Sequence, residues 1–348
     1  MNELSRRQFA LALAALMQAP AARQRVPAAD ERSQRAAAIA ALAATLRDEL
    51  AKSGAGSWDK WTQRLEPVRG EWQRVAVRSS LRGRNGYVFS KNALPYLVDT
   101  DLAAGPESTR PLDVIVAFDR KMKRRGIDLL YVPIPAIEEV YPENFLDSVP
   151  NDLTVQPGMR RFLLSLLERD VEVLDLLRPF QAARAGYRLG LKVDDHWNDV
   201  QIELAASLVA TRLRRYDVVR AAAADAKRYT TRPVAIRGER GITTMLQVIT
   251  PSGALYDDVE QSPVLVVGDS NLQVYQYQNE NLRNTGEHAG FSAHLARHLG
   301  LPVSLEAVGG FRPGTLNRDP VVFQRRRVVV FVGAAWLIST LAWGAVDD

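Results

Sequence analysis

The chain of 348 residues is long enough for one elaborated α/β domain or for two smaller domains. Its 45 Lys and Arg residues against 40 Asp and Glu residues give a net charge of +5. The basic residues are scattered, which argues against a nucleic-acid-binding stripe. The absence of cysteine excludes disulfides, thiolate chemistry and cysteine-ligated metal sites. Only four histidines can supply an imidazole: His196, His288, His294 and His298.

The amino-terminal segment has the pattern of an export signal. Arg6 and Arg7 precede an apolar run over 11–17, and small residues follow at 19–22. Paired arginines, a modest apolar stretch and small residues at a cleavage site are typical of a twin-arginine signal, which we expect at 1–24. The apolar run is too short to span a bilayer. We therefore predict export to a bacterial periplasm; the alternative is an amphipathic first helix of a cytosolic domain.

The segment after the expected signal, 25–79, reads as helical, beginning with an Ala-rich stretch up to residue 50. The dipeptide Asn85-Gly86 predicts a turn that feeds a short strand, which we expect to continue through Leu94–Leu97.

From residue 111 onward, helical and strand-like patterns alternate, which is typical of a parallel α/β sheet. The expected elements are a helix over 111–125, a strand over 128–133, a helix over 159–169, a strand over 171–176, a helix over 200–214, a hairpin within 229–252, a strand over 264–270, a helix over 290–299 and a strand over 303–308.

The carboxyl-terminal segment 328–345 contains eighteen residues without a charge, which by length alone could span a membrane. Its first five residues are mostly β-branched, however, and Gly333 interrupts the run. A buried last strand followed by a helix over 334–343 fits the α/β pattern better.

The buried strand at 264–267 ends in Gly268-Asp269-Ser270. Ligands bind at the carboxyl edge of open α/β sheets, so a serine there is a candidate nucleophile. A serine hydroxyl is inert at its free pKa and needs a base. The alternative is an ordinary turn in which Asp269 and Ser270 bond nearby amides.

A candidate base lies upstream in Asp194-Asp195-His196-Trp197. A catalytic imidazole needs one nitrogen facing the nucleophile and the other held by a carboxylate. In an extended Asp-x-His, residues 194 and 196 project to the same face, so we expect Asp194 to orient His196 and Asp195 to point away. The alternative is a hydrogen-bonded core histidine, with the acids capping the next helix.

Together these motifs resemble the SGNH-hydrolase-like alginate O-acetyltransferases, the AlgX and AlgJ family. The most specific feature of this resemblance is the order of the motifs along the chain. Here the Asp-x-His pair precedes the serine, whereas ordinary SGNH hydrolases place the serine before the Asp/His pair. The matching segments are 86–89, 96–97, 132–135, 141–143, 194–197, 266–270, 291–299 and 309–310.

The resemblance implies a three-layer α/β/α domain over 80–348 with a mostly parallel sheet and the catalytic motifs in permuted order. It implies that Ser270 attacks an acetyl donor, that His196 takes its proton and that Asp194 holds His196. The backbone amide of Ser270 and Gly309 or Gly310 are the implied oxyanion donors. Local chemistry alone adds Asn271 as a further candidate. We expect neither a cofactor nor a metal.

The expected reaction is acetyl transfer to a hydroxyl of an exopolysaccharide, alginate-like or cellulose-like. Because acetyl-CoA is not available in the periplasm, a membrane-bound acyl-donor protein is the expected partner. The segment 331–336 departs from the family because it is apolar where the family carries polar residues. A carbohydrate or acetyl esterase with the same triad, or a non-catalytic subunit of a polysaccharide-export complex, remain the alternatives.

Overall fold

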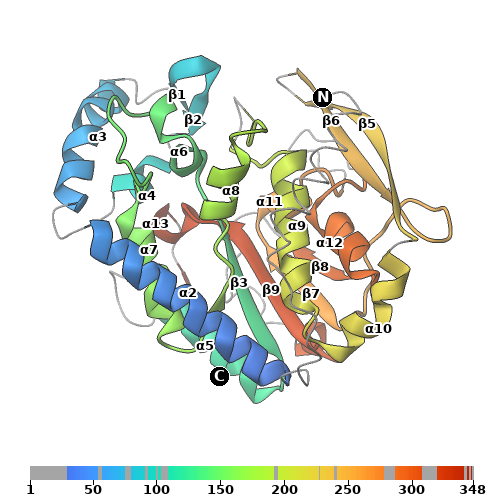
Figure 1. Ribbon diagram of the computed structural model, residues 1–348. Coiled ribbons are helices and arrows are strands. Elements are labelled where there is room, and N and C mark those ends of the chain that lie inside the picture. The colour runs from blue at the N-terminus through green and yellow to red at the C-terminus, as the bar shows by residue number, and fades with distance from the viewer. Residues whose placement is uncertain are drawn as a thin grey trace.

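The computed structural model of the protein (Figure 1) describes residues 30–53, 57–74, 80–90, 93–98, 101–102, 109–191, 195–226, 228–238, 241–277, 287–307, 320–340, 343–344 and 346. The expected signal at 1–24 lies outside these residues, as do Asp194, Gly309 and Gly310.

The centre of the molecule is a parallel sheet of five strands in the order β4-β3-β9-β7-β8. Its long members are runs of largely apolar residues that are buried along nearly their whole length, as parallel strands covered on both faces must be. The predicted α/β class with a mostly parallel sheet is confirmed. The strands are β3 (Asp128–Ile134), β4 (Glu172–Val173), β7 (Val264–Gly268), β8 (Ser304–Ala307) and β9 (Val328–Ala334).

Helices cover both faces of this sheet, because successive strand residues point to opposite sides. Leu129, Tyr131 and Phe331 pack into one core, together with residues of α5 (Pro111–Arg124) and α7 (Pro157–Leu167). Residues of alternate register such as Leu130 and Val330 pack into a second core.

The second core is completed by α9 (Asp199–Leu213) and α12 (Phe291–Leu299), so the architecture is three-layered. In Figure 1, α2 (Glu31–Ser53), α5 and α7 lie on one side of the strands, and α9 and α12 lie on the other. α10 (Asp217–Ala226) packs beside α12.

Two small antiparallel pairs flank the sheet. The predicted hairpin is present as β5 (Thr230–Gly238) and β6 (Gly241–Ile249), and it projects from the body in Figure 1. β1 (Ser80–Arg82) pairs with β2 (Val88–Ser90) across the short helix η1 (Arg84–Gly86).

The strand expected to continue through Leu94–Leu97 is wrong, because these residues lie in helix α4 (Ala93–Val98). A short apolar run does not distinguish a strand from a buried helical turn. Pro95 lies in the first turn of α4, where its missing amide proton is tolerated. The remaining helices are α3 (Ser57–Arg74), α6 (Ile137–Val140), η2 (Pro142–Asn144), α8 (Leu177–Ala183), α11 (Ser270–Gln273), η5 (Pro320–Phe323) and α13 (Leu337–Thr340).

The apolar carboxyl-terminal segment contributes the central strand of the sheet. β9 is buried along its whole length between β3 and β7. The helix expected over 334–343 is shorter, since Ala334 still belongs to β9 and only Leu337–Thr340 are helical. Within the part of the chain that the structure describes, no helix has the length and apolar character needed to cross a bilayer.

Candidate active site

The turn that carries Ser270 begins at a position that only glycine can occupy. A Cβ atom built on Gly268 would lie 1.9 Å from the carbonyl oxygen of Val332 in the neighbouring strand. Asp269 then caps α11, its Oδ1 accepting a hydrogen bond from the Asn271 amide at 2.8 Å. The other carboxylate oxygen, Oδ2, accepts from the Ala334 amide at 2.7 Å. The turn after β7 is thus fastened to the end of β9.

The predicted base and nucleophile meet at this edge of the sheet. Nε2 of His196 lies 3.1 Å from Oγ of Ser270, a hydrogen bond between residues 74 positions apart. The His196 side chain is 17% exposed, so it is reachable from solvent. A nucleophile and base within hydrogen-bond reach can carry out nucleophilic catalysis.

One detail of the sequence prediction is wrong. Asp195 does not point away from the site, because its Oδ1 lies 3.7 Å from Nδ1 of His196 and its side chain lines the same cavity as Ser270. This separation is too long for a direct hydrogen bond but close enough for electrostatic attraction to an imidazolium. The expected orienting role of Asp194 stays a prediction, since that residue lies outside the described ones.

Trp197 holds the His196 loop against the nucleophile turn. Its ring is 1% exposed and stacks on Phe291 of α12 at a centroid distance of 5.4 Å. Its Nε1 donates a hydrogen bond to the carbonyl oxygen of Asn271 at 2.9 Å. Immediately after it, Asn198 caps α9 through the Gln201 amide, so Asn198 rather than one of the acids is the cap. These contacts were not predicted, because they depend on segments far apart in the chain.

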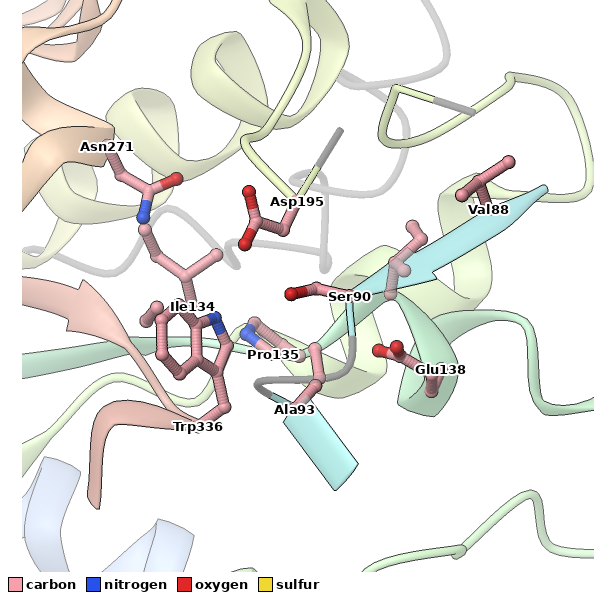
Figure 2. A pocket seen from close by; sticks show the side chains of 12 residues that line it. Val88, Ser90, Ala93, Ile134, Pro135, Glu138, Asp195, Asn271 and Trp336 are labelled. Carbon is pink, nitrogen blue, oxygen red and sulfur yellow. The ribbon is translucent and has the colours of Figure 1, made fainter. Parts of the chain in front are cut away.

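A cavity of about 150 Å³ opens over the nucleophile. Its lining residues are Asp195, His196, Asp269, Ser270, Asn271, Trp336 and Leu337. A second pocket adjoins it and shares Asp195, Asn271 and Trp336 with it (Figure 2). The apolar segment 331–336, flagged as a departure from the family, therefore supplies Trp336 to both hollows.

Asn271, expected as an oxyanion donor, does lie at the site. Its Nδ2 donates to Oδ1 of Asp269 at 2.9 Å, which fixes the orientation of the amide group. Its Oδ1 is buried and has no hydrogen-bond partner among the described residues. The oxyanion roles proposed for Asn271 and for the Ser270 amide stay predictions, as do those of Gly309 and Gly310.

Two buried acids on α6 were not predicted as part of the site. Glu139 accepts hydrogen bonds from the Tyr96 hydroxyl at 2.9 Å and from the Ala136 amide at 3.1 Å, and burial raises its pKa to about 7. Glu138 lines the second pocket, and burial raises its pKa to about 8. The sequence signal that could have found them is an acidic pair directly after the carboxyl end of β3. Among the described residues, no cluster of His, Asp and Glu is arranged to hold a metal ion.

The comparisons with known proteins agree with one another. Residues 81–250 match the family model described as "SGNH hydrolase-like domain, acetyltransferase AlgX". This segment contains His196 and ends before Ser270. Two curated relatives are each named "Probable alginate O-acetylase AlgJ". The relative from Azotobacter vinelandii is 27% identical over 137 residues, which cover 39% of this chain and 34% of the relative.

The second relative, from Pseudomonas syringae pv. tomato, is 26% identical over 161 residues, which cover 42% of this chain and 41% of the relative. The chain thus spans about a third to two fifths of the length of these relatives.

Two solved structures share the fold. The O-acetyltransferase domain of Pseudomonas putida AlgJ superposes with a TM-score of 0.54 at 18% identity, covering 76% of this chain and 94% of that one. Pseudomonas aeruginosa AlgX superposes with a TM-score of 0.51 at 14% identity, covering 75% of this chain and 66% of that one. The family model over 81–250 and the curated relatives, with the fold in agreement, support an SGNH hydrolase-like protein of the AlgX/AlgJ type.

Proposed function

We propose that this protein is an O-acetyltransferase that moves acetyl groups onto hydroxyls of a polysaccharide through an acetyl-Ser270 intermediate. The observation that carries the proposal is the 3.1 Å contact between Nε2 of His196 and Oγ of Ser270 at the mouth of a cavity. The family supports the same reaction class, since its model is described as an acetyltransferase and the relatives are named alginate O-acetylases.

The reaction has two half-steps that share one intermediate. Oγ of Ser270 attacks the carbonyl carbon of an acetyl ester while His196 Nε2 takes the hydroxyl proton. The donor oxygen leaves, receives that proton from His196, and acetyl-Ser270 remains. A sugar hydroxyl then attacks the same carbonyl carbon and gives its proton to His196. Oγ of Ser270 leaves and takes the proton back, which regenerates the free enzyme.

The supporting roles follow the same chemistry. Asp194 would hold Nδ1 of His196, and the Asp195 carboxylate, 3.7 Å from that nitrogen, would add to the stabilisation of the imidazolium. Backbone amides would stabilise the tetrahedral oxyanion, with the Ser270 amide as first donor and Gly309 or Gly310 as second. Asn271 is the side-chain candidate.

The cellular setting is part of the proposal. The twin-arginine pattern within 1–24 supports export to the periplasm, after which 25–79 would precede the acetyltransferase domain at 80–348. There, acetyl groups would come from a membrane-bound acyl-donor protein. The acceptor would be an exopolysaccharide of the alginate or cellulose type.

The decisive experiment is intact-protein mass spectrometry after incubation with p-nitrophenyl acetate. We expect a single acetyl adduct on the native protein and none on Ser270→Ala. Ser252→Ala, which alters an exposed serine in the turn after β6, is the matched control and should keep the adduct.

Adding oligosaccharides then distinguishes transfer from hydrolysis. Acetylated sugar supports the transferase, whereas free acetate alone would favour the esterase. If the native protein and Ser270→Ala both lack an adduct, the catalytic proposal is wrong and a non-catalytic export subunit becomes the better description.

A further inference from the structure

The pocket beside the nucleophile contains a buried acid that the proposed mechanism does not use. Glu138 of α6 is only 2% exposed. Among the described residues, its carboxyl group interacts with its own backbone amide and with no other hydrogen-bond donor. Figure 2 shows Glu138 and Ser90 on one side of this pocket, Trp336 and Asn271 on the other, and Asp195 between them. A buried carboxyl group can make more hydrogen bonds than this one, so a ligand or solvent can supply a further partner.

Burial, with a smaller effect of nearby carboxylates, raises the pKa of Glu138 so that its carboxyl group is mostly protonated at neutral pH. Burial is the main reason that its pKa rises to about 8, and the nearby carboxylates of Glu139 and Asp195 add to the effect. A protonated carboxyl group both donates and accepts a hydrogen bond. It therefore matches a hydroxyl group, which also donates and accepts a hydrogen bond.

The opposite side of the pocket contains a hydrogen-bond-accepting oxygen to which no group donates among the described residues. Oδ1 of Asn271 is buried and unpartnered among the described residues, and Asn271 as a whole is 5% exposed. Because Nδ2 of the same amide donates to Asp269, the oxygen is the atom that remains for a ligand. In Figure 2 this oxygen turns toward the side where Asp195 lies. An additional hydrogen-bond donor is what this side of the pocket needs.

We propose that this pocket is an acceptor subsite that binds uncharged hydroxyl or hydroxymethyl groups of the sugar, with Glu138 and Asn271 as its recognition residues. This inference rests on the proposed function, and it specifies the acceptor of that same site. The pocket shares Asp195, Asn271 and Trp336 with the cavity over Ser270, so a sugar held here lies next to the acetyl group.

Asp195, which also lines this pocket, discriminates against a carboxylate. A uronate carboxylate entering the pocket would lie beside the carboxylate of Asp195, and like charges in a partly desolvated site repel strongly. The acceptor sugar is therefore expected to present a hydroxymethyl group or a ring hydroxyl here, and not a carboxylate.

The test compares two acceptors that differ only at this group, cello-oligosaccharides and their C6-oxidised glucuronate forms. p-Nitrophenyl acetate serves as donor, and both the rate of Ser270 acetylation and the acceptor KM are measured. We expect the native protein to have a kcat/KM for the neutral acceptor at least about tenfold higher than for the oxidised one. Glu138→Ala should raise the KM for the neutral acceptor about tenfold, far more than it changes Ser270 acetylation.

Two further variants separate recognition from structure. Glu138→Gln keeps the shape and the paired donor and acceptor, so it should restore most of the acceptor affinity at pH 7. Glu143→Gln alters a half-exposed acid on the same segment, paired with Arg184 at 2.9 Å, and should leave the acceptor KM unchanged.

Each failure has its own signature. Two outcomes overturn the subsite alone, provided that Ser270 is acetylated normally. One is an equal acceptor KM for Glu138→Ala and Glu143→Gln, and the other is an equal kcat/KM for the neutral and the oxidised acceptor. Absence of any acetyl adduct on the native protein overturns the proposed function, and the acceptor subsite with it.

Discussion

Asp269 fastens the nucleophile turn to the neighbouring strand, because its Oδ2 accepts a 2.7 Å hydrogen bond from the backbone amide of Ala334. The other carboxylate oxygen accepts from the amide of Asn271. One side chain thus joins the carboxyl ends of β7 and β9, and the segments that follow these two strands contribute Ser270 and Trp336 to the cavity. The residue between Gly268 and Ser270 sets the position of the nucleophile without reacting itself.

Asp269→Asn tests this role. An amide group cannot accept at both positions, so at least one backbone donor loses its partner in a buried site. We expect unfolding free energy to fall by about 1–3 kcal/mol and Ser270 acetylation to slow. Urea unfolding and the acetylation rate are the measurements. Asp48→Asn, which changes an exposed acid paired with Lys52, should alter neither; equal behaviour of the two variants would contradict the role.

Gly268→Ala tests the close approach of β7 and β9. The added methyl carbon would overlap the carbonyl oxygen of Val332, which is backbone and cannot rotate away. We expect a loss of at least about 1–3 kcal/mol, read from the thermal midpoint. Gly70→Ala in helix α3 is the opposite control, because nothing lies within 4 Å of its new Cβ and alanine favours a helix. A stable Gly268→Ala protein would show that the strands can separate freely.

Glu138 also gives stability a defined dependence on pH. Its pKa is raised from about 4.5 in the unfolded chain to about 8 in the folded protein, so between these values the folded state binds more protons. Unfolding free energy therefore falls as pH rises through this window, by at most about 1.4 kcal/mol per pH unit for one such group.

Glu138→Gln cannot ionise at this position, so its unfolding free energy should fall less steeply with rising pH. The measurement is urea unfolding at a series of pH values between 5 and about 8.5. Glu139 contributes in the same direction, since its pKa of about 7 is also raised by burial. A slope that is identical in the variant and the native protein would mean that Glu138 ionises normally in the fold.

Arg160 and Asp175 form a buried ion pair whose disruption should be costly. Arg160 is 2% exposed and donates two hydrogen bonds to Asp175, at 2.6 and 2.8 Å. Asp175→Ala would leave a buried guanidinium without its hydrogen-bonded partner, and the remaining ion pair, with Glu49, is at 3.7 Å. We expect a loss of about 3–5 kcal/mol in urea unfolding, against less than about 1 kcal/mol for the exposed Asp48→Asn. A loss for Asp175→Ala no larger than that of the control would show that Arg160 finds another partner or water.

Local sequence patterns determined the main strands, the fold class and the candidate catalytic motifs. The runs at 128–133, at 264–270 and from 328 onward are apolar enough to predict strands, and their alternation with amphipathic helices predicts a parallel sheet. The motif order, Asp-x-His before Gly-Asp-Ser, was sufficient to indicate the family. The strands and each separate motif are readable because they depend on neighbours within a few residues, and the order of the motifs is read directly along the chain.

Tertiary structure decided what depends on distant contacts. Leu94–Leu97 lie in a helix whose Leu94, Tyr96 and Leu97 are buried, which their short apolar pattern did not distinguish from a strand. Asp195 lines the cavity although simple alternation placed it outside. Glu138 and Asn271, 133 positions apart in the numbering of the chain, reach one pocket only because β3 and β7 both end at the same edge of the sheet. Burial and partner choice set the charge state of such groups, and neither is encoded in a short stretch of sequence.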